Sequence, residues 1–435
     1  MIRTGNGAPS FRSQPQLQHF LQVSNSNTRL VQYSNRVNPT LNQVIVTSIA
    51  VMAPNYSHFR HRPLDLDRTQ IRLFRLVSKP SDSTIRGDIQ IFDFDKCPAY
   101  QAVSYTWGPP NPTRNIYITD GDGDKRFVVR ENLWQFLRQQ HDANVIRGSY
   151  YPAMDDCMGV YSGEYSDGYI GHCIGDYSGD YIGNCTLEWF WIDQICIDQS
   201  TTNERNHQVR LMSRIFSQAY QVLVWLGPAA DGSDQAMDAI SSRQYSVIQI
   251  YLAEIQNLFQ RPYWYRLWIL QEVIMARQAA VLCGSKMFPW TWLQDLYMPP
   301  SPSTLVDPDF RQMLEPAPAS LIREKALVSS SRQPGERLGH ILRTFAGMHC
   351  QDPRDKVFGL LGLVRPSRRI TVDYSMTVKE VFFAAVGKIF EDESCMGVGT
   401  NVKLALGLRS RMGLRGSVSS ASLTKMAEKI SRSRY

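Results

Sequence analysis

Two apolar segments on either side of an amphipathic helix constrain the fold of this chain most. The first begins at Trp189–Ile192 and the second is Gln221–Leu226. Apart from Gln221 both are continuously apolar, which is typical of strands buried on both faces of a parallel sheet. Thr201 and Glu204 have the spacing of a capping box, and an apolar helical face follows at Val209, Met212, Ile215, Phe216 and Ala219. A strand, a helix and a strand in this order predict a βαβ unit, and therefore an α/β sheet.

Other segments of the chain extend this sheet. Apolar patterns that predict strands occur at Gln70–Val77, Ile89–Phe92, Tyr100–Trp107, Asn115–Thr119 and Arg126–Val129. The Gly-rich turn Asp120–Asp124 joins the last two as a hairpin. Helices are expected over Asn132–Gln140 and from near Pro262 to Met275. The fold class that we expect is α/β, with a mostly parallel sheet flanked by helices.

Composition divides the chain into five parts. We assign residues 1–65 as a disordered extension rich in Gln, Asn and Ser, and 66–295 as the α/β domain. A Pro-rich linker at 296–320, a helical region at 321–395 and a basic tail at 396–435 follow. A low-complexity insertion at 155–185 interrupts the α/β domain, and we expect a flexible loop there. Its Cys and His residues match neither a zinc nor an EF-hand spacing, so no metal site is expected.

The formal net charge of +7 resides in the tail. Residues 401–435 hold eight Lys and Arg but one acid, Glu428. Like-charge segments are usually solvated, which favours a flexible extension. Contact of the tail with nucleic acid or an anionic membrane is the alternative.

Several features favour a cytoplasmic protein. The longest apolar stretch near the N-terminus, Val44–Ala53, is too short for a membrane span, and no charged-then-apolar leader precedes it. The eight cysteines form no CxxC pair, which suits a reducing compartment. An acid-poor start would allow a mitochondrial presequence, but Pro9 and Pro15 interrupt the helix that such a signal needs.

Three blocks of sequence occur in an order that points to a family. The first is Tyr100–Gly108 with Asn132 and Leu133; the second is Trp191–Gln199 with Glu204, Arg205, Gln208, Val209, Met212 and Val224–Gly227; the third is Arg261–Trp268 with Gln271, Glu272, Cys283 and Gly284. Together they resemble the fungal heterokaryon incompatibility (HET) domain. Asp352–Gly362 and Val372–Ser375 resemble the segment that commonly follows this domain. The resemblance covers residues 70–390 and implies a role in nonself recognition between hyphae and in the resulting cell death.

The same blocks are remotely similar to Toll-receptor-type (TIR) domains, which have a flavodoxin-like fold. Val103–Thr106 is similar to their first strand, Trp191–Asp193 to their second, and Trp268-x-x-x-Glu272 to their Trp-x-x-x-Glu motif. Some TIR domains cleave NAD at the nicotinamide–ribose bond with that glutamate. The similarity therefore implies a catalytic role for Glu272 and NAD as a substrate; no other cofactor is implied.

The residues themselves are compatible with that role. Trp268 and Glu272 are four apart and share a helical face, where a half-buried carboxylate beside an indole has a raised pKa. The ligand crevice of a parallel sheet lies beyond the carboxyl ends of its strands. The candidate binding residues at that edge and on that helix are Ser104, Tyr105, Trp107, Gly108, Asp193, Asp198 and Trp268.

Each of these residues also has a structural interpretation. Glu272 also suits a structural hydrogen-bond or ion-pair partner, for instance of Arg266. Trp107, Trp191 and Trp225 suit a core. Asp193 and Asp198 suit caps of the next helix. Three functions therefore remain open: an NAD-cleaving enzyme, a non-catalytic self-association module, and a decayed copy without activity. The expected partners are a second copy of the chain or another incompatibility protein.

Overall fold

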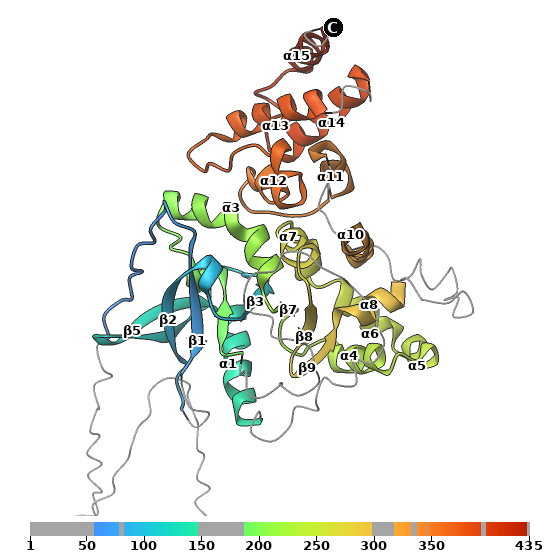
Figure 1. Ribbon diagram of the computed structural model, residues 1–435. Coiled ribbons are helices and arrows are strands. Elements are labelled where there is room, and N and C mark those ends of the chain that lie inside the picture. The colour runs from blue at the N-terminus through green and yellow to red at the C-terminus, as the bar shows by residue number, and fades with distance from the viewer. Residues whose placement is uncertain are drawn as a thin grey trace, which may run out of the picture. The chain divides into compact units, whose positions relative to one another are not determined.

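The computed structural model describes residues 56–77, 82–146, 187–297, 317–331, 337–345, 347–392 and 397–432 (Figure 1). From Ser57 onward these residues belong to one compact unit. The predicted disordered extension lies outside the described residues up to residue 55, as do the insertion at 155–185 and residues 298–316 of the predicted linker. The domain boundaries assigned from composition stay predictions.

Nine strands of the described chain form one sheet, in the order β5-β4-β2-β1-β6-β3-β7-β8-β9. Their bounds are β1 Gln70–Leu76, β2 Arg86–Asp93, β3 Tyr100–Tyr105, β4 Thr113–Asp120, β5 Gly123–Arg130, β6 Trp189–Trp191, β7 Gln221–Trp225, β8 Ala279–Cys283 and β9 Lys286–Pro289. The predicted strands and the β4–β5 hairpin are confirmed. The α/β class is confirmed with them.

The sheet is mixed, whereas the sequence predicted a mostly parallel one. Parallel pairing joins β6, β3, β7 and β8 at the centre, and β2 to β4. The other four pairs are antiparallel. Strands added by tight turns, as in the β4–β5 and β8–β9 hairpins, must run antiparallel, and their apolar patterns carry no sign of direction. Across the sheet the four central strands lie in the order β6-β3-β7-β8, so the second of them in the chain lies first, followed by the first, third and fourth.

The helices of the described residues follow the strands. Those that follow or connect the central strands are α1 Glu131–Ile146, α2 Asp193–Cys196, α3 Thr202–Gln218, α4 Ser233–Ser242, α5 Tyr245–Ile250, α6 Leu252–Phe259, α7 Ile269–Ile274 and α8 Trp290–Tyr297. Those beyond the sheet are α10 Ala317–Ser331, α11 Leu338–Thr344, α12 Asp355–Phe358, α13 Val378–Asp392, α14 Val398–Arg411 and α15 Ser420–Arg432. Short 3₁₀ turns occupy Phe94–Lys96, Pro262–Tyr265, Leu361–Leu363 and Pro366–Arg368.

Two predicted elements are shorter than their patterns indicate. The apolar run after Glu188 is a strand only to Trp191, and then turns into α2. The helix expected from Pro262 is a 3₁₀ turn followed by α7, which begins at Ile269. Trp268 caps α7, and the Glu272 amide donates to its carbonyl at 3.2 Å, so the predicted one-turn spacing of these residues is confirmed.

The capping box predicted for α3 is wrong, although the helix does begin at Thr202. The Thr201 hydroxyl donates to Asp198, and the Glu204 carboxylate instead forms a bidentate pair with Arg72, at 2.5 and 2.9 Å. Arg72 and Glu204 are both almost fully buried, with 1% and 3% exposure. A buried guanidinium requires a counter-ion far more than a helix start requires a cap, so Arg72 takes this carboxylate.

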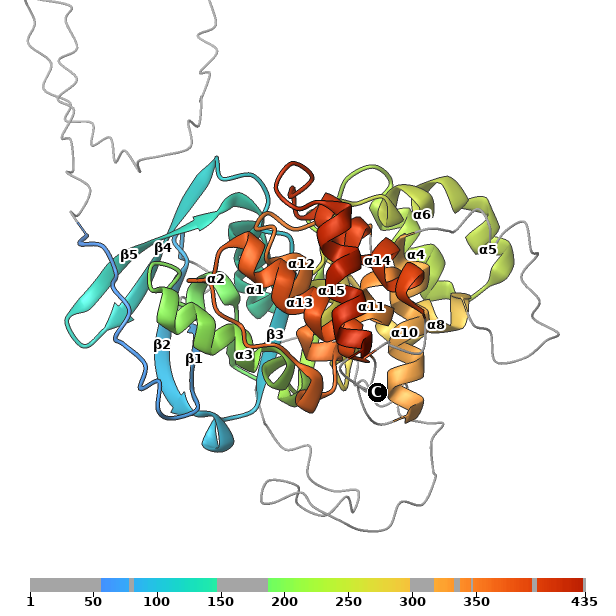
Figure 2. The ribbon, with the colours of Figure 1, turned by 90° about the horizontal axis from the view of Figure 1, so that it is seen from above.

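The basic tail is not the solvated extension that its charge favours. Residues 398–432 form α14 and α15, whose Leu404, Leu408 and Leu423 are buried in the same hydrophobic core as the sheet. The apolar residues recur at helical spacing and face inward, while Lys425 and Lys429 are exposed. Figure 1 shows α11–α15 beyond α3 and α7, on the side away from the strands, and Figure 2, the view from above, shows α13 and α15 in front.

Among the described residues, no helix combines the length and the apolar character required to cross a bilayer.

Candidate functional site

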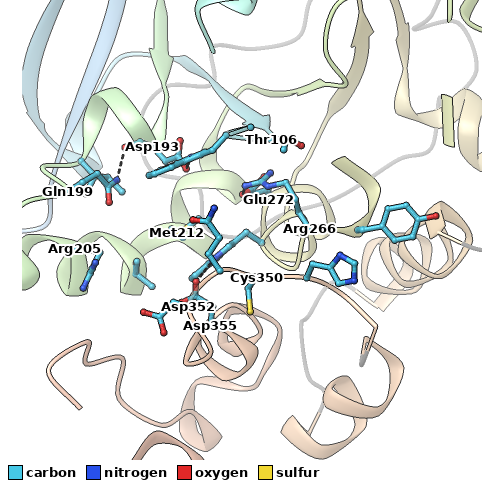
Figure 3. Close-up of a pocket in the computed structure, with 18 of the residues that line it drawn as sticks. Thr106, Asp193, Gln199, Arg205, Met212, Arg266, Glu272, Cys350, Asp352 and Asp355 are labelled. Carbon is cyan, nitrogen blue, oxygen red and sulfur yellow. Dashed lines mark hydrogen bonds and ion pairs between the residues drawn. The ribbon is translucent and has the colours of Figure 1, made fainter. Parts of the chain in front are cut away.

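A cavity of about 540 Å³ lies between the sheet and the C-terminal helices (Figure 3). Four parts of the chain line it: the loop after β3, the region from α2 into α3, the turn into α7, and the segment before and after α12. The lining residues are Thr106, Trp107, Gly108, Asp193, Ile197, Gln199, Arg205, Val209, Met212, Pro262, Tyr265, Arg266, Trp268, Glu272, His349, Cys350, Gln351, Asp352, Asp355 and Tyr374.

The cavity lies at the carboxyl ends of two central strands. Thr106–Gly108 follows β3 directly, and Asp193 comes two residues after β6. The chain passes from β3 to its neighbour β6, and then crosses back to β7 on the other side of β3. In open α/β sheets, this reversal opens a crevice beyond the strand ends, where ligands bind. The topology therefore places the cavity where the sequence predicted a crevice.

Glu272 lies in the wall of the cavity within a buried polar cluster. Its carboxylate pairs with Arg266, whose Nη1 and Nη2 lie 3.3 and 3.4 Å from Oε2 and Oε1. The Ser104 hydroxyl donates to Oε2 and lies 2.6 Å from the Tyr263 hydroxyl. Figure 3 shows Glu272 and Arg266 side by side. The ion pair anticipated from the sequence is thus present, and Glu272 also belongs to the lining of the cavity.

Burial raises the pKa of Glu272, and the contacts with Arg266 and Ser104 oppose that shift. The sequence predicted a raised pKa from a half-buried carboxylate beside an indole. The side chain is instead 3% exposed, and the Trp268 indole donates to Asp355 at 3.1 Å. The direction of the predicted shift agrees with the structure, but its cause is burial and not the indole.

Asp193 is the second carboxylate near Arg266. The Trp107 indole donates to its Oδ2, and the Gln194 amide to its Oδ1, each at 2.7 Å. Burial raises its pKa, and attraction to Arg266 opposes this. Trp107 is therefore a hydrogen-bonded wall of the cavity and not the core residue of the alternative interpretation, which holds for Trp191 and Trp225.

The structure brings five of the predicted site residues to the cavity and leaves three outside its lining. Trp107, Gly108, Asp193, Trp268 and Glu272 line it. Ser104 and Tyr105 are buried in β3 behind it, where Ser104 still contacts Glu272. Asp198 accepts hydrogen bonds from Ser200 and Thr201 ahead of α3, the local role that the structural interpretation gave it.

The opposite wall was not predicted. It comes from the segment after α11, and its polar residues include Asp352, Asp355 and Tyr374. A signal was present: Asp352–Gly362 and Val372–Ser375 were part of the family resemblance. Their position 80 or more residues beyond Glu272 gave no indication that they would face it.

Asp355 is held rigidly in this opposite wall. Its Oδ2 accepts from the Trp268 indole, and its Oδ1 from the Tyr374 hydroxyl at 2.6 Å. Burial raises the pKa of Asp355 to about 6, while both hydrogen bonds oppose the shift. A second link, from the Gln271 amide to the Phe358 carbonyl at 3.1 Å, joins α7 to α12. The α7 turn that carries Glu272 is thus tied to both walls.

Chemically, the cavity offers carboxylates at fixed positions, aromatic walls and two guanidinium groups. Within the described residues, no His, Cys, Asp or Glu side chains gather in a group able to hold a metal ion. Cys196 is buried, which raises the pKa of its thiol to about 12. The arrangement suits stabilisation of positive charge by Glu272 in a site screened from water.

Comparisons with known proteins agree with the resemblance. The family model "Heterokaryon incompatibility protein (HET)" matches residues 181–272, and so ends at Glu272. A relative from Neurospora crassa, "Heterokaryon incompatibility protein 6, OR allele", is 31% identical over 167 residues, which are 38% of this chain and 19% of that protein. No solved structure matches the chain. The chain therefore contains a heterokaryon incompatibility (HET) domain.

Proposed function

We propose that this chain acts in the cytoplasm in fungal nonself recognition and the cell death that follows, by cleaving NAD in the cavity. The observation that carries the proposal is the position of Glu272. This carboxylate lies in a cavity at the carboxyl ends of the central strands, one helical turn after Trp268. The name of the Neurospora relative supports the biological role, and this chain spans about a fifth of that protein's length.

The arrangement of the sheet supports a TIR-type fold at the centre of the domain. The four parallel strands follow the order 2-1-3-4, which is the beginning of the flavodoxin-like order. The strands outside them, β1, β2, β4, β5 and β9, are additions to that order. The ligand site of flavodoxin-like sheets lies at the reversal next to the first parallel strand, here β3.

The proposed reaction is hydrolysis of the bond between nicotinamide and ribose. The bond's electron pair leaves with nicotinamide, whose ring nitrogen loses its positive charge, and an oxocarbenium-like ribose develops. The Glu272 carboxylate stabilises this cation, and water supplies the hydroxyl at the ribose carbon and releases a proton. Arg266 and Ser104 orient the carboxylate, and Trp107 and Trp268 offer faces for the planar nicotinamide.

A non-catalytic self-association module is the second candidate. The observation that favours it is that both Glu272 oxygens already have partners inside the chain, as a purely structural carboxylate would. In that case, a second copy of the chain or another incompatibility protein would be the partner. The exposed Lys425 and Lys429 of α15 leave contact with nucleic acid or an anionic membrane as a further possibility for the tail.

The test is inducible expression in a fungal host, with viability and cellular NAD followed in parallel. Death together with NAD loss is the expected result, and Glu391→Gln, a change at an exposed helical carboxylate, is the matched control that should behave like the parent. Death at constant NAD would favour the association module. Survival with constant NAD would indicate a decayed copy.

A further inference from the structure

Arg205 is a cation in the cavity wall that forms no salt bridge with the residues the structure describes, although its charge helps to lower the pKa of Asp352. Of the two arginines that line the cavity, Arg266 pairs with Glu272, whereas the structure gives Arg205 no ion pair to any described residue. The Nε–H of Arg205 is buried and has no acceptor in the described part of the chain. A buried donor without a partner costs about 1–3 kcal/mol, so proteins seldom retain one without a reason.

The guanidinium of Arg205 is nevertheless held in place. It lies over the ring of Tyr374, with 4.3 Å between its Cζ and the ring centroid. Tyr374 is itself fixed, since its hydroxyl donates to Asp355 and its backbone amide to Asn206. Stacking on a tyrosine leaves the outer N–H groups of an arginine available to a planar or tetrahedral anion.

The carboxylates near Arg205 already have other partners. Asp352 forms a bidentate pair with Arg354, at 2.6 and 3.0 Å. Asp355 accepts hydrogen bonds from Trp268 and Tyr374. Arg354 also contacts the Tyr374 ring, but its N–H groups already have partners, because it donates to the Tyr374 and Met376 carbonyls as well as to Asp352. The positive charge of Arg205 is therefore the one that an incoming anion meets on this side.

We propose that Arg205, stacked on Tyr374, binds a phosphate group of a nucleotide ligand in this cavity. The inference rests on the proposed function in naming the nucleotide, because NAD carries a pyrophosphate. Arg205 lies on α3 and Glu272 on α7, two elements that line the cavity separately (Figure 3). The volume of the cavity, about 540 Å³, is within the usual range of small-molecule binding sites. One nucleotide can then present its ribose to Glu272 and its phosphates to Arg205.

Calorimetric titration of the full chain tests this directly, with ADP-ribose, inorganic pyrophosphate and adenosine as probes. Arg205→Met keeps the aliphatic stem against Tyr374 and removes the charge. We expect it to raise the Kd for ADP-ribose about tenfold or more and to leave adenosine unchanged. Arg214→Met is the matched control, because Arg214 lies on the same helix, outside the cavity lining, where it pairs with Asp95 and stacks on Phe94.

The outcomes separate this inference from the catalytic proposal. Binding of ADP-ribose that depends on Arg205, in a chain that does not consume NAD, would support the phosphate-binding role of Arg205 and refute the enzyme proposal. A folded Arg205→Met variant that binds ADP-ribose as the parent does would overturn the inference. So would a parent that binds none of the probes, or adenosine as tightly as ADP-ribose. Should Arg205→Met unfold, Arg205→Gln replaces it, because glutamine also removes the charge, and unchanged affinity for ADP-ribose in that variant would equally overturn the inference.

Discussion

Replacing Glu272 by Gln separates the structural role of this residue from the catalytic role proposed for it. The substitution keeps the size of the side chain and one oxygen that can accept from Ser104. It removes the charge that pairs with Arg266 and turns an N–H group toward that guanidinium. Because Glu272 is 3% exposed and the Arg266 side chain 17%, solvent replaces little of the lost interaction.

The expected loss of stability follows from this burial. Breaking a buried ion pair costs about 3–5 kcal/mol when the remaining charge has no other partner. Arg266 keeps the attraction of Asp193, so we expect the lower end, about 3 kcal/mol. Arg266→Met should cost a similar amount. The double variant should cost less than the sum of the two, by about 1–3 kcal/mol, because the second substitution removes the stranded group.

Urea unfolding of the parent, both single variants and the double variant measures this coupling, and NAD consumption is assayed on the same samples. The enzyme proposal requires that NAD consumption be lost in every variant without Glu272, including the double variant whose stability is partly restored. Additive stability losses would refute the ion pair as an energetic unit. Full NAD consumption by a folded Glu272→Gln variant would refute catalysis by this residue.

Three further predictions address stability. Trp225→Ala should lower the free energy of unfolding in urea by about 3–5 kcal/mol, because Trp225 is 1% exposed. Tyr220 is 54% exposed, so Tyr220→Ala should change that free energy by no more than about 0.5 kcal/mol. Equal losses in the two variants would mean that β7 is not a core strand. Burial raises the pKa of Asp355 to about 6 in the folded state, against 3.8 in the unfolded chain, so the folded state binds more protons between these pH values and its stability falls as pH rises through them. Asp355→Asn should lessen that fall by about 3 kcal/mol. Parallel curves of unfolding free energy against pH for the two proteins would contradict this prediction. Lys325 on α10 donates hydrogen bonds to the Val273 and Ala276 carbonyls at the end of α7. Lys325→Met should therefore lower the melting temperature by several degrees. An unchanged melting temperature in calorimetry would show that these hydrogen bonds contribute nothing to stability.

The local elements could be predicted because each has its own signal. Continuous apolar runs mark β6 and β7, and the Gly-rich turn marks the β4–β5 hairpin, irrespective of the rest of the chain. Strand direction and pairing partners carry no such signal, so the antiparallel pairs β1–β2, β1–β6 and β8–β9 were not predicted. The capping box failed for a related reason: Glu204 was read against its own helix, and its actual partner, Arg72, lies 132 residues away.

The candidate site divides in the same way. Trp268 and Glu272 could be placed on one helical turn because their relation is local. Arg266, six residues before Glu272, was a correct candidate for the same reason. Asp355 and Tyr374 form the opposite wall, and only the packing of α12 against α7 brings them there. The packing of the tail was missed because the prediction weighed its eight cations against one acid and left the helical spacing of its apolar residues aside.

The two walls of the cavity have a consequence for any activity. The hydrogen bonds that join its walls, from Trp268 to Asp355 and from Gln271 to Phe358, start on the helical turn that carries Glu272. A change that loosens α12 therefore frees α7 on one side, and a change at Glu272 frees it from Ser104 and Arg266 on the other. The geometry at Glu272 is the joint product of the sheet and the C-terminal segment. The part of the chain beyond the matched residues 181–272 is thus as much a component of the site as the domain that carries the glutamate.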